Sequence, residues 1–206
     1  MKFRRKATIE PDAPETEAAG SVEPLEGPYD ADEAPAKAAE AERVDLGSLL
    51  VAPLAGRELR LQVDESTGVV AAVLLTTDEG ALELRAFAAP RGGDLWSEVV
   101  PQLEADIKAR GGEAQLREGR WGTEVLCQLP VQLPDGQTGA QVSRMIGFNG
   151  PRWLLRATFI GRPAVDQDHA AEWEPALTDV VVRRGAHALP VGDALPIVIP
   201  PEAHPA

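Results

Sequence analysis

Apolar and polar residues alternate along the chain in a way that predicts β-strands from residue 57 onward. Over 57–63 the apolar positions recur with a period of two, which is typical of a half-buried strand. A continuous apolar run rich in β-branched residues follows over 69–76, then a turn over 77–80 and a further strand over 81–88. We expect these last two strands to pair as a hairpin.

Apolar residues at helical spacing predict a first helix after this hairpin. Asp94 can cap its start, and Gly111 with Gly112 can end it. Pro101 lies inside the helical pattern and predicts either a kink or a later start. The apolar positions of this helix lie four residues apart: Leu95, Val99, Leu103 and Ile107.

The C-terminal half is expected to add more strands and a second helix. Strand patterns cover 113–118, 123–129, 141–148 and 153–160, and helical spacing returns over 175–184. The order of elements predicts an α+β fold, with a single mainly antiparallel sheet and two helices packed on one face.

Two parts of this pattern resemble each other. Residues 70–87 and 142–159 each form two predicted strands around a turn, and each leads through a short loop to a helix. Each helix bears one tryptophan, Trp96 or Trp173. A duplicated β-β-α unit and generic α+β patterning both account for this similarity.

Composition divides the chain into three parts. Residues 7–42 hold eleven acidic residues and one basic residue, which predicts that 1–45 is a disordered acidic arm, either a solubilising tail or a docking arm. The α+β domain is expected over 46–190. The C-terminal segment 191–206 is rich in proline, and its apolar stretch 195–199 either lies on the domain edge or binds another protein.

The charge balance favours a protein partner over nucleic acid. Twenty Lys and Arg residues stand against thirty-three Asp and Glu residues, a net charge of −13, whereas phosphate backbones attract basic surfaces. The basic start 1–6 leads into acidic residues, so we expect no signal peptide, no membrane span and a cytoplasmic location. Cys127 is the only cysteine, which excludes an intrachain disulfide.

The sequence predicts no catalytic residue and no cofactor. It has neither a G-x-S-x-G nucleophile motif nor a G-x-G-x-x-G phosphate loop, and Cys127 is expected to be buried and inert. One cluster of metal-ligand residue types occurs: Asp166, Asp168, His169 and Glu172. A metal site is one interpretation of this cluster, and acidic residues at a helix start, favoured by the helix dipole, are the other.

Five arginines are candidates for binding an anion or nucleic acid. Arg91 precedes two glycines and a predicted helix start, where free N–H groups and the guanidinium could hold an anion. The others lie on or near the last predicted hairpin: Arg144, Arg152, Arg156 and Arg162. Binding of single strands also requires exposed aromatic rings. Trp153 and Phe159 alternate against Arg156 and are expected in the core, which disfavours nucleic acid.

Several short runs resemble a known family. They are the run DLWSE at 94–98, the run GPRWLLR at 150–156, Gly161 and the closing Leu-Pro-rich segment. Over about residues 45–200 the chain is similar to an actinobacterial family of cytoplasmic proteins with a domain of unknown function. The resemblance implies a gene often encoded near dUTPase and a loose link to nucleotide or nucleic-acid upkeep. It transfers no functional residue to this chain.

We therefore expect a non-catalytic protein-interaction or adaptor domain, with another protein as its partner. Two alternatives from other classes remain open. One is a nucleotide or nucleic-acid associated binding protein, and the other is a metal-dependent enzyme that uses the cluster around Asp166 and His169.

Overall fold

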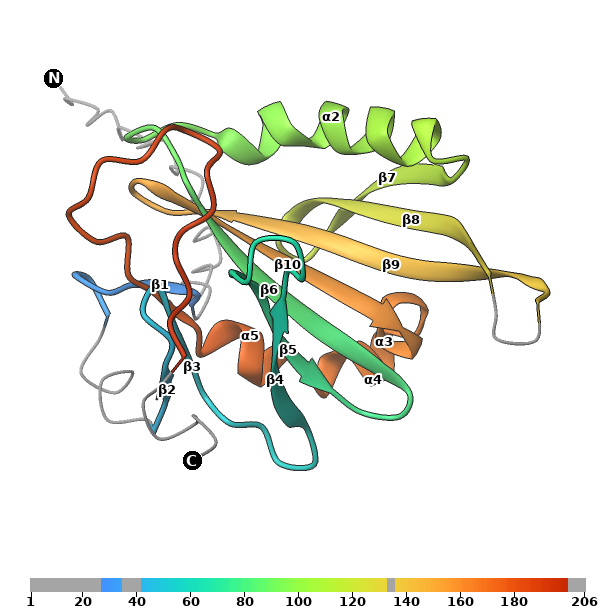
Figure 1. The fold of residues 1–206 in the computed structure, drawn as a ribbon, viewed down its shortest axis with the longest axis horizontal. Coiled ribbons are helices and arrows are strands. Elements are labelled where there is room, and N and C mark those ends of the chain that lie inside the picture. Colours follow the sequence, from blue (N-terminus) through green and yellow to red (C-terminus); the bar gives the residue numbers. More distant parts are fainter. Residues whose placement is uncertain (1–26, 35–41, 133–135, 200–206) are drawn as a thin grey trace, which may run out of the picture.

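The structure, a computed structural model, describes residues 27–34, 42–132 and 136–199 (Figure 1). Part of the predicted disordered arm 1–45 falls within these ranges and forms two short strands, β1 (Tyr29–Asp30) and β2 (Val44–Asp45). The rest of that arm lies outside the described residues.

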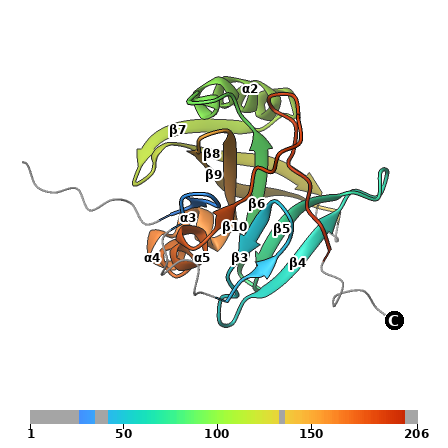
Figure 2. The ribbon, with the colours of Figure 1, turned by 90° about the vertical axis from the view of Figure 1, so that its left-hand side faces the viewer.

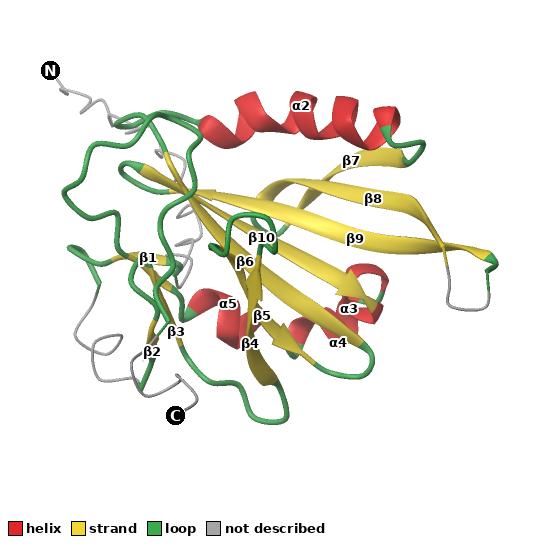
Figure 3. Ribbon diagram, viewed as in Figure 1, coloured by secondary structure: helices red, strands yellow, loops and turns green. Residues whose placement is uncertain are grey.

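The strands of the described chain form two sheets (Figure 3). The larger sheet has seven antiparallel strands in the order β4-β5-β6-β10-β9-β8-β7. These strands are β4 (Glu58–Val63), β5 (Val70–Thr76), β6 (Gly80–Ala88), β7 (Glu113–Gly119), β8 (Gly122–Gln132), β9 (Thr138–Asn149) and β10 (Trp153–Gly161). The predicted hairpins over 70–87 and 142–159 correspond to the pairs β5–β6 and β9–β10.

The smaller sheet has the order β1-β11-β3-β2. It adds β3 (Leu49–Val51) and β11 (Val181–Val182), and β1 pairs with β11 in parallel. β11 takes the place of the second half of the predicted helix 175–184, since β-branched valines favour a strand. The helix that remains there is short, α5 (Glu174–Thr178).

The predicted α+β fold, with a single sheet and two helices on one face, is wrong, since the described chain is mostly β and has two sheets. Besides the second sheet, the long helix α2 (Leu95–Ala109) lies on one face of the large sheet and α5 on the other (Figures 1 and 2). Neighbouring residues of β10 show this, because Leu154 packs in the cluster of α2 and Leu155 in the cluster of α5. Helices on opposite faces also rule out a doubled β-β-α unit with both helices on one side.

Each face of the large sheet has its own apolar core. The core under α2 includes Leu95, Trp96, Val100, Ile107, Val125, Cys127 and Leu154. The core on the other face joins the large sheet to the small sheet and to α5, and includes Leu49, Val51, Leu84, Leu155, Phe159, Trp173 and Leu177. Two short helices, α3 (Arg162–Val165) and α4 (Gln167–Ala171), complete this second layer.

The proline-rich C-terminal stretch lies beside the last residues of β6, which extend beyond the part of β6 that pairs with β5. Leu195 N donates a hydrogen bond to Ala86 O at 2.8 Å, and Val198 N donates to Leu46 O at 2.9 Å. Leu195 is buried. This segment therefore covers an edge that would otherwise expose unpaired backbone groups, and residues 200–206 lie outside the described part of the chain.

The side chain of Asp94 fixes the start of α2, which continues through Pro101 without a delayed start. It accepts hydrogen bonds from Ser97 Oγ at 2.5 Å and Ser97 N at 3.1 Å, and the Asn149 amide donates to it at 2.7 Å. These bonds, those from Ser97 first, hold the pKa of Asp94 below its ordinary value.

Replacing Asp94 with alanine is expected to lower the free energy of unfolding by about 1 kcal/mol at about pH 7, because a helix cap is lost. A carboxyl with a lowered folded pKa stabilises the fold only while it is ionised. The contribution is therefore complete above the unfolded value of 3.8 and is lost as the pH falls through the folded pKa. Denaturant unfolding should show that the free energies of unfolding of the wild-type protein and of Asp94→Ala differ less at about pH 3 than at about pH 7. An equal difference at both pH values would contradict this assignment.

Candidate functional site

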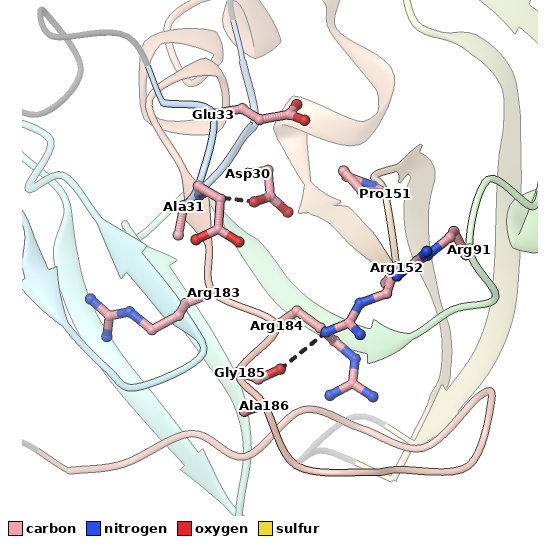
Figure 4. A pocket seen from close by; sticks show the side chains of 11 residues that line it. Asp30, Ala31, Glu33, Arg91, Pro151, Arg152, Arg183, Arg184, Gly185 and Ala186 are labelled. Atoms are coloured by element: carbon pink, nitrogen blue, oxygen red, sulfur yellow. Dashed lines mark hydrogen bonds between the residues drawn. The ribbon is translucent and has the colours of Figure 1, made fainter.

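A pocket of about 640 Å3 opens where four segments of the chain meet (Figure 4). Its walls are residues 30–33 after β1, Arg91 in the loop before α2, residues 151–152 in the β9–β10 turn, and residues 183–186 after β11. We call it the arginine pocket, since a guanidinium comes from each of the last three segments.

Backbone hydrogen bonds hold these segments together. Gly92 N donates to Pro151 O at 3.2 Å, which ties the loop of Arg91 to the β9–β10 turn. Ala31 N donates to Val182 O at 2.9 Å, which ties the segment after β1 to the end of β11. The arginine pocket is thus formed by the fold itself rather than by side chains alone.

Three of its arginines carry charges that no carboxylate balances within the described residues. Arg152 Nη2 donates to Gly185 O at 3.3 Å and Arg184 Nη1 donates to His187 O at 3.0 Å, but carbonyl groups do not neutralise a guanidinium. Arg91, Arg152 and Arg184 form no ion pair there.

The fourth arginine of the pocket, Arg183, is paired. Its Nη1 lies 3.0 Å from both oxygens of Asp45. Burial raises the pKa of Asp45, yet hydrogen bonds from Gly47 N and Arg183 outweigh it and hold that pKa below its ordinary value. Arg183 therefore anchors β11 and adds less to the unbalanced charge than its neighbours.

Carboxylates occupy the opposite wall of the arginine pocket. Asp30 accepts hydrogen bonds from Trp153 Nε1 at 2.6 Å and from Asp32 N at 2.9 Å, so it is fixed in place. Asp32 and Glu33 are exposed. Figure 4 shows Asp30 and Glu33 on one side and Arg91, Arg152 and Arg184 on the other, so the pocket is bipolar.

The structure brings together two of the five predicted anion-binding arginines, Arg91 and Arg152. Arg156 instead lies on β10, where it pairs with Glu83 at 3.3 Å. Arg162 begins α3 and forms ion pairs with Glu79 and Asp166. Arg144 is buried and lies outside the arginine pocket.

The residues of the predicted metal cluster make other contacts instead. Asp166 caps α4 by accepting a hydrogen bond from His169 N at 3.1 Å, the first cause of its lowered pKa. His169 Nδ1 lies 3.9 Å from Glu172, but Glu172 itself is held by Arg57 at 2.8 Å, and Asp168 is exposed. Across the described ranges, no group of three or more His, Cys, Asp or Glu side chains is placed to hold a metal ion.

Sequence reasoning missed several residues of the pocket. Arg183 and Arg184 fell at the end of a predicted helix, and Asp30, Asp32 and Glu33 fell in the arm predicted to be disordered. The one available signal was the pair of adjacent arginines directly before Gly185.

Fold and site together define a predominantly β domain with helices on both faces and an arginine-lined pocket. The chain belongs to the DUF3710 family, described as a protein of unknown function, which matches residues 27–206. This confirms the resemblance to a domain of unknown function. No described helix is long and apolar enough to cross a membrane.

Two solved structures are similar to this chain. One is a crystal structure of a protein from Bacteroides thetaiotaomicron VPI-5482, with 14% identity and a TM-score of 0.40 over 69% of this chain. The chain spans about half of that protein, 48% of its length. The other is the solution structure of cyanobacterial PsbP (CyanoP) from Synechocystis sp. PCC 6803, with 11% identity and a TM-score of 0.38 over 68% of this chain and 91% of that one. Neither likeness bears on function, and no curated protein matches the sequence.

Proposed function

We propose that this chain is a non-catalytic protein-interaction domain whose arginine pocket binds an acidic segment of a partner protein. The observation that supports it is the convergence of Arg91, Arg152 and Arg184 with no carboxylate partner among the described residues. Guanidinium groups so placed repel one another. A bound carboxylate relieves that repulsion and accepts charge-assisted, bidentate hydrogen bonds.

The charge distribution favours a peptide over nucleic acid. Residues 46–206 hold fourteen basic and twenty-one acidic residues, so the surroundings of the pocket repel a phosphate backbone. The acidic wall of Asp30, Asp32 and Glu33 repels it further, whereas a peptide of mixed charge can pair with both walls. The described lining also offers no aromatic ring on which a base could stack.

We also propose a cytoplasmic location, for which the support is the single cysteine. The actinobacterial origin and the dUTPase neighbourhood implied by the resemblance stay predictions. Within the described ranges, no observation supports the alternative of a metal-dependent enzyme.

Binding of a fluorescent peptide of glutamate, lysine and glycine residues, with glutamates in excess, tests the proposal. The variant Arg91→Glu/Arg152→Glu is expected to bind it at least about tenfold more weakly, since each lost charge-assisted hydrogen bond is worth about 1.5–3 kcal/mol. The matched control is Arg60→Glu/Arg110→Glu, which changes the net charge equally at exposed positions outside the pocket. The control is expected to lose far less affinity.

Two results would count against the proposal. Equal losses in the pocket variant and the control would show that only overall charge attracts the peptide. Tighter binding of a single-stranded oligonucleotide than of the peptide, measured at the same salt concentration, would assign the pocket to nucleic acid instead.

A further inference from the structure

A second polar cavity, of about 250 Å3, lies between the β7–β8 turn and helices α4 and α5. It shares no lining residue with the arginine pocket. The residues that matter for its chemistry are Arg144, Trp121, Glu124, Arg117 and Glu174. We call it the Arg144 cavity.

Arg144 is a buried cation whose hydrogen-bonding capacity is unused. Its side chain is only 6% exposed, and its guanidinium lies over the ring of Phe159, 4.5 Å from the centroid. Its Nε and Nη2 atoms are buried and have no hydrogen-bond partner among the described residues. Its Nη1 lies 3.9 Å from Glu124, which is an ion pair but too long for a hydrogen bond.

The other groups around Arg144 do not satisfy these donors. Glu124 is buried and accepts a hydrogen bond from Arg117 Nε at 2.9 Å. Trp121 adds another buried donor, since its Nε1 also lacks a partner in the described part of the chain. Burial, with the charge of Arg117, lowers the pKa of Arg144 despite the nearby carboxylates. The cavity therefore has unused donors and needs an acceptor.

We propose that the Arg144 cavity binds a small monocarboxylate, whose oxygens accept hydrogen bonds from Arg144 and from Trp121 Nε1. A planar carboxylate matches the guanidinium fork and offers several acceptor sites. This ligand site is separate from the peptide-binding pocket and does not depend on it.

Size and charge narrow the class of ligand. The cavity volume of about 250 Å3 is below the usual range for drug-sized ligands, about 300–1,000 Å3, so the ligand has the size of an amino acid or a short hydroxy acid. Three arginines line the cavity together with three glutamates: Arg117, Arg120, Arg144, Glu118, Glu124 and Glu174. A balanced lining accepts a monoanion with less repulsion than a phosphate dianion.

Side-chain NMR of the full chain tests this site directly. Acetate, L-alanine and phosphate are titrated separately, with sodium chloride at matched ionic strength as the reference. The carboxylates are expected to shift the Trp121 indole N–H and Arg144 Nε–H signals saturably, while chloride leaves them in place. Trp121→Phe keeps an aromatic ring but removes one donor, and is expected to weaken binding several-fold.

Arginine variants provide the matched comparison. Arg144→Gln is expected to weaken carboxylate binding at least about tenfold. Arg156→Gln also removes a half-buried, ion-paired arginine, but from a residue outside the cavity lining, and is expected to leave the affinity unchanged. If Arg144→Gln does not fold, Trp121→Phe carries the comparison with Arg156→Gln.

Three results would overturn the proposal. The first is the absence of saturable shifts with either carboxylate, which would show that Arg144 has a structural role only. The second is tighter binding of phosphate than of the carboxylates. The third is carboxylate shifts confined to Arg91 and Arg152, which would support the arginine pocket while removing the Arg144 site.

Discussion

Replacing Glu124 with glutamine is expected to destabilise the fold by about 3–5 kcal/mol, because it leaves a buried cation without its counter-charge. Glu124 is 2% exposed and lies between Arg117 Nε at 2.9 Å and Arg144 Nη1 at 3.9 Å. Glutamine has nearly the same shape, so the loss reports charge rather than a cavity. Denaturant unfolding at neutral pH measures it.

Two further variants show whether the buried charge is the cause. Replacing both Glu124 and Arg144, as in Glu124→Leu/Arg144→Met, is expected to recover most of the lost stability, since the buried cation is removed and only the partly exposed Arg117 loses its partner. Glu58→Gln breaks the exposed pair with Arg60 and is expected to change stability little. A loss in Glu124→Gln no greater than that in Glu58→Gln would refute the argument.

The strands of the large sheet were predictable, because each is long enough to show a period. β5, β6, β9 and β10 each cover seven or more residues, and their predicted hairpins agree with the observed pairs. The strands of the small sheet have only two or three residues each. So short a run contains no detectable alternation, and its pairing depends on tertiary contacts.

The sequence contained a signal for helices on both faces of the large sheet, and the predicted single-faced arrangement did not use it. Trp153, Leu154 and Leu155 are consecutive, apolar and all buried. Successive side chains of a strand point to opposite faces, so such a run requires a packed layer on each side. A single-faced arrangement of helices would have exposed Leu154.

The candidate sites were partly visible in the sequence. Arg91 and Arg152 were identified as anion ligands, but no local pattern shows that a loop and a turn sixty residues apart share a pocket. Arg144 was predicted only as an anion-binding candidate on or near the last hairpin. Its position on β9 has the same parity as Ile146 and Phe148, so the alternation places it on the apolar face where the structure has it.

Trp173→Ala is expected to lower the free energy of unfolding by about 3–5 kcal/mol, the usual cost of truncating a buried aromatic side chain. Trp173 is fully buried in the core that joins α5 to both sheets, with Arg57 over its ring at 4.8 Å. The substitution removes the ring and leaves a cavity in this core. Denaturant unfolding measures the loss.

Phenylalanine variants separate the packing of the indole from its hydrogen bonding. Trp173 Nε1 has no partner among the described residues, whereas Trp153 Nε1 donates to Asp30 at 2.6 Å. Both substitutions remove a similar volume, so Trp153→Phe is expected to cost about 1.5–3 kcal/mol more than Trp173→Phe, the value of a hydrogen bond to a charged group. Equal costs would show that the contact with Asp30 contributes nothing to stability. A larger cost in Trp153→Phe would show that the bond to Asp30, which lies between β10 and the acidic wall of the arginine pocket, stabilises the fold.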